Sequence, residues 1–338
     1  MSEADPYSAL FHVLSALPAV PVGRVLFINA QDGAGLALLP RDAVLMQPLI
    51  HLAAPLKALG YQVVSDIPDQ QTFDAVIMLA TKQHDETRGL LAQGLSILKD
   101  AGWLIVAGAN DYGGKRLAAD FSALGLVAQQ ESRDKSRVVL ARKDQSIPPD
   151  VIATWIAAAA WQPALGGEFI TRPGLFSWNR ADPGSRLLQQ NIPATLHGYG
   201  ADFGCGYGFL SAHILRSCAG VQKLYALDAH EWAVQACAQN TRFADARIEC
   251  RPHDLSHRPD LPPLDFIVMN PPFHEGARVQ NQLGIAFIRH ARACLKKSGV
   301  LYMVANNHLP YEEILRGCFT TVDEITKQNG FKIIKAHA

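Results

Sequence analysis

Residues 270–274 read N-P-P-F-H, and these residue types can hold a planar amino group in place for a reaction. They follow the apolar run 264–269, which predicts a buried strand. Asn270 offers a side-chain oxygen and Pro271 a backbone carbonyl, while the prolines lock φ and lack an N–H. The two acceptors can bind both hydrogens of an exocyclic –NH2, and Phe273 can stack on the ring that carries it. We therefore predict that Asn270, Pro271 and Phe273 are the catalytic residues, with Phe273 also a substrate contact.

A glycine-rich turn precedes this segment in the same half of the chain. Residues 199–203 predict a strand, 204–208 a turn, and 209–216 a helix. Gly204, Gly206 and Gly208 permit positive φ and close backbone approach, which a nucleotide-like ligand over such a turn requires. Taken alone, however, a turn of this kind is more often an ordinary strand–helix connection.

Two acids at later strand ends make the pattern specific. Asp228 ends a predicted strand and lies 26 residues after Asp202 (228 − 202), where this architecture holds a ribose diol. Asp254 follows the next strand and is placed to accept a hydrogen bond from an adenine amino group. Ligands bind at the carboxyl ends of the strands in open α/β sheets, so these features converge on one crevice. The predicted cofactor contacts are Asp202, Gly204, Gly206, Gly208, Asp228, Asp254 and Asn270.

The elements that position these residues form two α/β sheets in tandem, both doubly wound. Strands near 24–29, 61–66, 73–80 and 103–108 alternate with helices in the first half, and 126–142 predicts a terminal hairpin. In the second half, strands near 199–203, 223–227, 246–250, 264–269 and 300–304 precede a hairpin at 321–335. Its turn contains the N-G pair 329–330, a good hairpin signal. We place a linker around 143–150, where prolines interrupt the pattern, and expect the alanine-rich helix 151–161 to pack between the domains.

The first half repeats the second without its chemistry. Residues 73–81 align with 264–272, and 98–106 align with 295–303, which indicates a duplication. We align 29–33 with the turn 202–206. Leu79 and Ala80 then replace Asn270 and Pro271, so the first copy lacks both the cofactor turn and the amine-binding pair. We predict a degenerate, non-catalytic domain at 1–145 and a catalytic domain at 151–338.

Composition limits the class of protein. The chain has 338 residues, of which 49% are apolar and 18% charged, as in an ordinary soluble globular protein with two cores. No apolar run is long enough for a membrane helix, and the acidic start is not a signal peptide. Lys plus Arg equals Asp plus Glu at 31 each, so any RNA affinity must come from a local patch. The six cysteines lack C-x-x-C spacing, which favours buried or turn thiols in a reducing cytoplasm and no metal site.

These motifs, together with R-P-G-L-F-S at 172–177, D-P-G-S at 182–185 and A-N-N-H-L-P-Y at 305–311, resemble a class I S-adenosylmethionine-dependent methyltransferase. Specifically, the chain resembles the ribosomal RNA small subunit guanine-N2 methyltransferase C family over essentially its whole length. The resemblance implies two Rossmann-like methyltransferase domains closed by antiparallel hairpins. It also implies S-adenosylmethionine as cofactor, 16S ribosomal RNA as partner, naked or in the small subunit particle, and a cytoplasmic enzyme. We expect a monomer.

The predicted reaction is methyl transfer to the exocyclic N2 of a guanine. The nitrogen lone pair is conjugated with the ring, so positioning of the amine is the main task. No dedicated base is required, and the loop residue His274 is less typical of a base than of a solvated histidine. A base within a helix cannot reach the crevice, so the guanine must be unpaired or flipped out.

Several residues are candidates for RNA contacts. Arg172, Arg180 and Arg186 lie near the entry of the predicted catalytic domain. Asn307 and Tyr311 follow the fifth strand and either line the base pocket or cap a helix. Asp265 recurs as Asp74 in the degenerate copy, which favours a structural role. The basic residues of the first hairpin alternate in a pattern that is usually just solvated.

Two alternatives stay open. The same amine-binding pair suits adenine N6 or a protein glutamine amide. A third class is a non-catalytic RNA-binding assembly factor, against which the intact acids and Asn270 argue. Cofactor binding and identification of the methylated product separate these alternatives.

Overall fold

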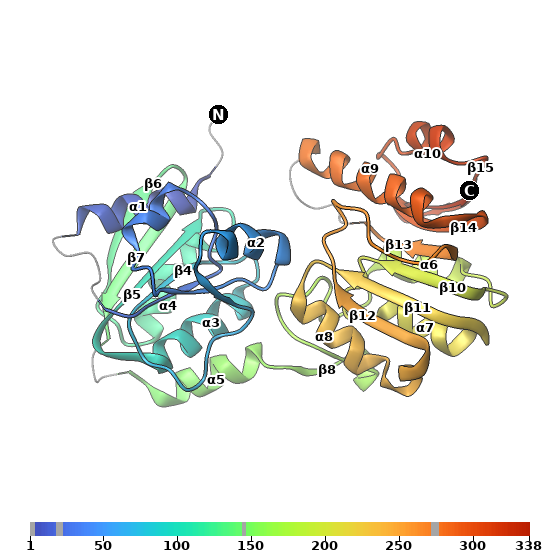
Figure 1. Ribbon diagram of the computed structural model, residues 1–338. Coiled ribbons are helices and arrows are strands. Elements are labelled where there is room, and N and C mark those ends of the chain that lie inside the picture. Colours follow the sequence, from blue (N-terminus) through green and yellow to red (C-terminus); the bar gives the residue numbers. More distant parts are fainter. Residues whose placement is uncertain (1–3, 18–22, 144–146, 272–276) are drawn as a thin grey trace. The chain divides into compact units, whose positions relative to one another are not determined.

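The computed structural model describes residues 4–17, 23–143, 147–271 and 277–338 (Figure 1). The chain divides into two compact units. The first unit contains Met1–Trp161 and the short segment Arg172–Gly174, and the second contains Gln162–Thr171 and Leu175–Ala338. No helix in the described ranges is both long enough and apolar enough to cross a membrane.

The first unit is a seven-stranded sheet in the order β3-β2-β1-β4-β5-β7-β6. Neighbouring strands from β3 to β5 are parallel, whereas β7 and β6 close the sheet as an antiparallel pair. The strands are β1 (Val25–Ile28), β2 (Val44–Met46), β3 (Gln62–Val64), β4 (Phe73–Leu79), β5 (Leu98–Ala109), β6 (Gln129–Arg133) and β7 (Ser136–Arg142). The helices are α1 (Pro6–Ala16), α2 (Ile50–Ala58), α3 (His84–Ile97), α4 (Leu117–Ala123) and α5 (Pro149–Ala159), with 3-10 turns η1 (Ala34–Leu38) and η2 (Gly114–Arg116).

The second unit repeats this topology as β12-β11-β10-β13-β14-β16-β15. The strands are β10 (His197–Phe203), β11 (Gly220–Asp228), β12 (Ile248–Pro252), β13 (Leu264–Met269), β14 (Leu295–Asn306), β15 (Thr321–Gln328) and β16 (Phe331–His337), preceded by a small hairpin of β8 (Gln162–Ala164) and β9 (Phe169–Thr171). The helices are α6 (Pro183–Asn191), α7 (Phe209–Ser217), α8 (Glu231–Asn240), α9 (Ala277–Cys294) and α10 (Glu312–Cys318), with η3 (Leu165–Gly167) and η4 (Arg242–Arg247). The predicted fold of two doubly wound sheets with closing hairpins is confirmed.

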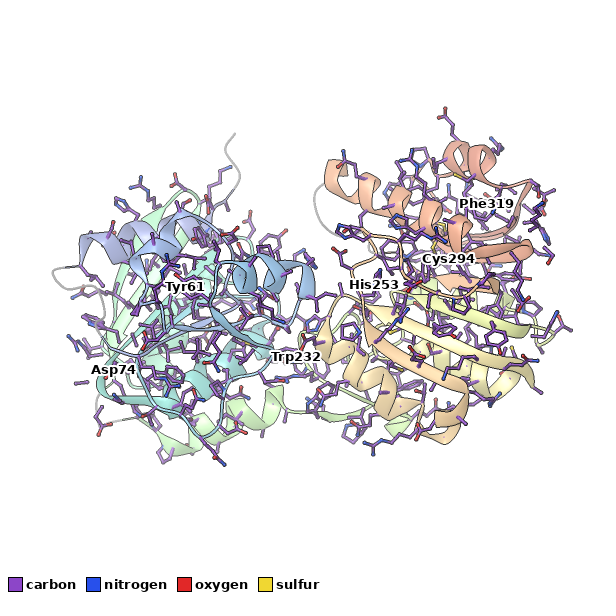
Figure 2. All side chains as sticks on the ribbon, viewed as in Figure 1. Tyr61, Asp74, Trp232, His253, Cys294 and Phe319 are labelled. Atoms are coloured by element: carbon purple, nitrogen blue, oxygen red, sulfur yellow. The ribbon has the colours of Figure 1, made fainter. Side chains whose placement is uncertain are left out.

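Both faces of the second sheet are covered, which explains why residues 266–269 of β13 are all apolar instead of alternating. One face packs against α9 and α10 in a core that includes Cys294 and Phe319 (Figure 2). The other face packs against helices α6 and α7 and the buried Cys237 of α8. At the end of the sheet, Asn329 and Gly330 both have positive φ, as the predicted N-G hairpin turn requires.

Three details of the first unit differ from the sequence-based expectation. Strand β2, of three residues, is not among the predicted strands. The domain boundary was expected at 145–151, but the first unit extends to Trp161. Helix α5 packs on α3 within that unit, where Arg88 lies 4.7 Å from the centre of the Trp155 ring.

The strand register also corrects the alignment of the two turns. Ile28 pairs with Met78 in the first unit, and Phe203 pairs with Met269 in the second. Because β4 corresponds to β13, the counterpart of Asp202 is Phe27, and the counterpart of Gly204 is Asn29, two residues away from the predicted alignment. Asn29 adopts φ of 56° where Gly204 adopts 78°, so the backbone conformation is retained without the glycine.

A matching carboxylate ties the sheet together in both units. Asp74 accepts hydrogen bonds from the backbone of Arg24 (2.8 Å) and from Lys99 (2.7 Å). Asp265 accepts the same two bonds, from the backbone of Tyr199 (2.8 Å) and from the Lys296 side chain (2.6 Å). The structural role expected for Asp265 from its recurrence is therefore confirmed.

We expect Asp74→Asn to lower the free energy of unfolding by roughly 0.5–1 kcal/mol at pH 7, a small value because this ion pair is partly exposed and screened. The hydrogen bond from Lys99 holds the pKa of Asp74 below its ordinary value. A carboxyl group whose pKa is lower in the folded protein than in the unfolded chain stabilises the fold at pH values above its pKa in the unfolded chain. This stabilisation is lost as the pH falls through the pKa of the folded protein. Urea unfolding at pH 7 and pH 3 measures the free energy of unfolding of the variant and the wild type. An equal difference in free energy at the two pH values would contradict the prediction.

Candidate active site

A pocket opens at the carboxyl ends of β10 and β13 in the second unit. Its position at the carboxyl edge of parallel strands is where open α/β sheets bind ligands. The pocket is lined by Phe176, Ser177, Asp182, Ser185, Gly204, Cys205, Gly206, Tyr207, Phe209, Leu210 and Asn270. The predicted glycine turn and the predicted amine-binding asparagine therefore meet in one cavity.

The glycine turn is fixed to the neighbouring strand β11 and leaves space above it. The backbone N–H groups of Gly204 and Cys205 both donate to the Leu227 carbonyl, at 2.8 and 3.0 Å. At Gly206, with φ of 53°, a Cβ atom would have nothing within 4 Å, so its missing side chain leaves open space. Gly208 has a different role: a Cβ atom there would lie 2.9 Å from the sulfur of Cys237, so this glycine permits close helix packing.

Asp202 lies beneath the turn and is completely buried. Its Oδ2 accepts a hydrogen bond of 2.7 Å from the hydroxyl of Ser211, on helix α7. Burial raises the pKa of Asp202 to about 7, and the nearby Asp228 carboxylate adds to the rise, while the Ser211 bond opposes it. Asp202 therefore supports the turn from below and is not part of the pocket lining.

The two later acids are engaged with local backbone. Asp228 accepts hydrogen bonds from the N–H groups of Gly206 and His230, both at 2.9 Å. Burial raises its pKa, and these bonds oppose the rise. Asp254 accepts from the backbone N–H (2.9 Å) and the hydroxyl (2.7 Å) of Ser256. Neither acid lines the pocket, although Asp228 contacts the pocket residue Gly206 directly.

Asn270 has its side-chain orientation fixed by two residues that the sequence analysis did not assign to the site. Its amide nitrogen donates to Oδ2 of Asp182 (3.0 Å) and to the hydroxyl of Ser185 (2.8 Å). Both belong to the D-P-G-S motif at the start of α6, where Asp182 caps the helix by accepting the Ser185 N–H at 2.7 Å. The D-P-G-S motif indicates the start of a helix. It does not indicate that Asp182 contacts Asn270, a residue 88 positions away.

Aromatic side chains surround the opening of the pocket. Phe176 is 49% exposed, and Tyr207 and Phe209 complete the aromatic lining. Pro271 is buried beside Asn270. The predicted residues Phe273 and His274 lie outside the described part of the chain.

Arg180 and Arg186 are exposed, so both remain available to a nucleic acid. Asn307 donates its backbone N–H to the Gly330 carbonyl at 2.9 Å. Its counterpart Asn110 makes the same bond to Lys135 in the first unit, which indicates a structural role for this position. Tyr311 is only 1% exposed, packs in the core and stands at the N-cap position of α10, which agrees with the helix-capping alternative.

Arg172 was also expected to contact RNA, but it is only 6% exposed and belongs to the first unit. Its Nη1 lies 3.5 Å from a carboxylate oxygen of Asp66, and its guanidinium carbon lies 5.4 Å from the ring centre of Trp161. Burial lowers its pKa, while Asp66 and Glu86 oppose the change. These contacts hold Arg172 away from solvent, so we no longer assign it to an RNA interface.

A glycine turn beneath a pocket at the carboxyl edge of a doubly wound sheet defines a Rossmann-like domain of the kind that binds nucleotide-containing cofactors. The family model named methyltransferase small domain matches residues 166–335, or 170 of the 338 residues. The chain belongs to this family.

Whole-length relatives agree with that assignment. A ribosomal RNA small subunit methyltransferase C from Shewanella halifaxensis is 29% identical, over 92% of this chain and 89% of its own. A protein of the same name from Idiomarina loihiensis is 28% identical, over 97% of this chain and 98% of its own. These relatives carry the family name that the motifs indicated, so the resemblance is confirmed.

A solved structure matches both units of the chain together. The T. thermophilus 16S rRNA N2-guanine methyltransferase, in complex with AdoMet and guanosine, matches with a TM-score of 0.79. The match covers 99% of this chain and 93% of that one, at 23% sequence identity. It establishes the tandem fold.

The buried Asp202 gives a testable pH dependence. Because its pKa is raised to about 7, the folded protein keeps a proton that the unfolded chain has already released near pH 4, so stability falls as the pH rises through this window. We expect Asp202→Asn, which keeps an acceptor for Ser211, to be more stable than wild type at pH 8. The gain in the free energy of unfolding should be about 1.4 kcal/mol for each pH unit that separates the pKa of Asp202 in the unfolded chain from its pKa in the folded protein. The gain should become smaller as the pH falls toward 4. Thermal unfolding of the variant and the wild type at pH 5 and pH 8 measures this difference in stability. A difference that is the same at both pH values would contradict the prediction.

Proposed function

We propose that this chain transfers a methyl group from S-adenosylmethionine to the exocyclic N2 of a guanine in 16S ribosomal RNA. The observation that carries the proposal is the fixed amide of Asn270, which presents its oxygen beside the glycine turn. The names of the whole-length relatives support the RNA substrate. The AdoMet and guanosine bound to the T. thermophilus enzyme support the cofactor and the base.

The residues present fit S-adenosylmethionine. The open space above Gly206 admits a ligand close to the backbone, and a side chain there would fill it. Asp228 lies at the end of β11, where its carboxylate can exchange the Gly206 N–H for ribose hydroxyls. Asp254 is the proposed partner of the adenine amino group. The buried carboxylate of Asp202 and the half-buried carboxylate of Asp228 also favour a positively charged ligand nearby.

The proposed mechanism relies on positioning. Asn270 accepts one hydrogen of the guanine amine through Oδ1, and the carbonyl of Pro271 accepts the other. These bonds hold the nitrogen so that its lone pair points at the methyl group. Bound S-adenosylmethionine supplies a methyl group that its sulfonium charge makes electrophilic. Once the nitrogen is alkylated its proton is acidic and leaves to solvent, so no residue is assigned as a base. Phe273 is proposed to stack on the base.

We infer that the first unit does not bind the cofactor, because its own side chains fill the corresponding turn. Asn29 donates its side-chain N–H to the Leu79 carbonyl at 2.9 Å, and Leu79 stands in place of Asn270. Gln47 stands in place of Asp228 and donates to the Ala30 carbonyl at 2.7 Å. A Cβ atom on Gly33 would lie 2.7 Å from the Tyr7 hydroxyl, so Tyr7 covers this turn as well. The proposed role of this unit is to stabilise the protein and to help position RNA.

RNA binding is proposed to involve Arg180 and Arg186, the exposed cations of the second unit's entry segment and α6. We propose that the enzyme acts as a monomer in the cytoplasm, on 16S rRNA either naked or within the small subunit particle. The alternative substrates, adenine N6 and a glutamine amide, would use the same acceptors. Nucleoside analysis of the methylated RNA separates guanine from adenine, and label recovered in protein identifies the glutamine alternative.

A single S-adenosylmethionine should bind per chain. We expect Asp228→Ala to weaken binding by roughly 1.5–3 kcal/mol, because it removes charge-assisted hydrogen bonds to the ribose. The matched control is Gln47→Ala at the corresponding position of the first unit, which should leave the dissociation constant unchanged. Isothermal titration calorimetry measures both, and two sites per wild-type chain would contradict the inference about the first unit.

Asn270→Ala should reduce methyl transfer on the order of 10²-fold or more while leaving cofactor affinity nearly unchanged, because the acceptor acts on the reacting amine. Transfer of labelled methyl to small-subunit RNA, followed by nucleoside mass spectrometry, measures the rate and identifies the product. Wild-type label in N6-methyladenine or in protein, instead of N2-methylguanine, would overturn the substrate assignment. Unchanged turnover by the variant would overturn the mechanism.

A further inference from the structure

Asp182 and Ser185 hold the side-chain amide of Asn270 from helix α6, and all three residues line the same pocket. We refer to Asp182, Ser185 and Asn270 as the amide clamp. An amide nitrogen carries two hydrogens, and the clamp provides one acceptor for each, at 3.0 and 2.8 Å. The oxygen Oδ1 is then the only polar atom of the Asn270 side chain left for a ligand.

The opposite orientation of the amide is unfavourable. A carboxylate can only accept hydrogen bonds, so turning Oδ1 toward Asp182 would place two acceptors against each other. Ser185 is only 8% exposed, so water cannot easily replace the lost bonds. The clamp therefore gives the pocket an acceptor, suited to an amino group, and withholds a donor that would suit a carbonyl.

The first unit shows the same helix start without this contact. Asp5 and Ser8 occupy the matching D-P-x-S-x-L positions, and helices α1 and α6 pack on corresponding strands of their sheets. Asp5 caps α1 by accepting the Ser8 N–H at 2.9 Å, as Asp182 caps α6. The Ser8 hydroxyl donates to Asp5, because the residue that corresponds to Asn270 is Leu79. Helix capping therefore accounts for the motif in both units, and the bonds to Asn270 are an addition in the second.

We propose that Asp182 and Ser185 are positioning residues that fix Asn270 as a hydrogen-bond acceptor and thereby determine selection of an amino group at the reacting position. The inference rests on the proposed function, because it assigns these residues a part in the same methyl transfer. Neither residue contacts the reacting atoms, and both act through Asn270. The acceptor is oriented before substrate arrives, so no reorganisation is required in the transition state.

Capping and positioning are separated by choosing variants that keep the cap. Asp182→Ser retains a good N-cap, but its shorter side chain does not reach Asn270. Asp182→Asn keeps both the cap and an acceptor oxygen. We expect kcat to fall on the order of tenfold in Asp182→Ser and several-fold in Ser185→Ala, but to stay within about threefold of wild type in Asp182→Asn. The matched controls Asp5→Ser and Ser8→Ala should leave kcat unchanged.

A double-mutant cycle tests whether the residues act through Asn270. In the Asn270→Ala background, Asp182→Ser and Ser185→Ala should cause no further loss of kcat, and the cofactor dissociation constant should stay constant throughout. If Asp182→Ser and Ser185→Ala lower kcat equally with and without Asn270, their role is merely structural and the proposal is overturned. Wild-type turnover in both single variants would also overturn it.

Hydrogen exchange of the Asn270 side-chain amide gives a readout that does not depend on activity. With asparagine labelled at its side-chain nitrogen, the signal that Asn270→Ala removes identifies the group. We expect protected amide protons in the full-length wild type and faster exchange in Asp182→Ser and Ser185→Ala. Unprotected protons in the wild type would overturn the clamp whatever the product. Protected protons in an enzyme that makes no N2-methylguanine would instead overturn the proposed function alone.

Discussion

The parallel pairing of β10 with β13 is the constraint on which the site depends. Phe203 pairs with Met269, so the next residues, Gly204 and Asn270, leave the sheet at the same edge. A Cβ atom on Gly204 would lie 3.7 Å from the Asn270 backbone oxygen, and any longer side chain would extend into the space beyond. The first unit shows this outcome, because Asn29 occupies the position and bonds to the Leu79 carbonyl. Strand β11 then contributes Asp228, which contacts the glycine turn. The start of helix α6 contributes the other two members of the amide clamp, which hold Asn270.

Electrostatics in this region favour a cationic ligand although the whole chain has no net charge at neutral pH. Asp202 is buried and Asp228 is half-buried, and desolvation raises the pKa of each carboxyl group. Hydrogen bonds from Ser211, Gly206 and His230 offset this desolvation cost only in part. A positive charge in the pocket would lower both pKa values and recover part of the cost. The same carboxyl groups whose desolvation costs stability at neutral pH therefore favour the proposed binding of S-adenosylmethionine.

Sequence reasoning located the residues whose chemistry depends on local pattern. The glycine turn and the N-P-P segment each follow a strand, and a rule about strand ends was enough to bring Gly206 and Asn270 into one pocket. The rule about strand ends does not predict contacts between segments that are far apart in the sequence. The bond from Asn270 to Asp182 spans 88 positions, and the burial of Tyr311 depends on its packing against helix α9, where Gly284 leaves room for it. The two-residue alignment error arose because the first unit adopts a positive φ at Asn29, where no glycine marks the turn.

The duplication separates residues that maintain the fold from residues that carry chemistry. The carboxylates Asp74 and Asp265 make the same bonds in both units, so their recurrence reflects the sheet. The caps Asp5 and Asp182 also recur, and Asp182 has a second role besides capping, since its Oδ2 accepts both donors. The two units differ at several positions in or beside the pocket, among them Gly204 against Asn29, Asp228 against Gln47, and Asn270 against Leu79. An asparagine at the last position is held as an acceptor only where a carboxylate stands at the helix start to orient it, so the cap of α6 is the feature on which the proposed amine-binding site depends.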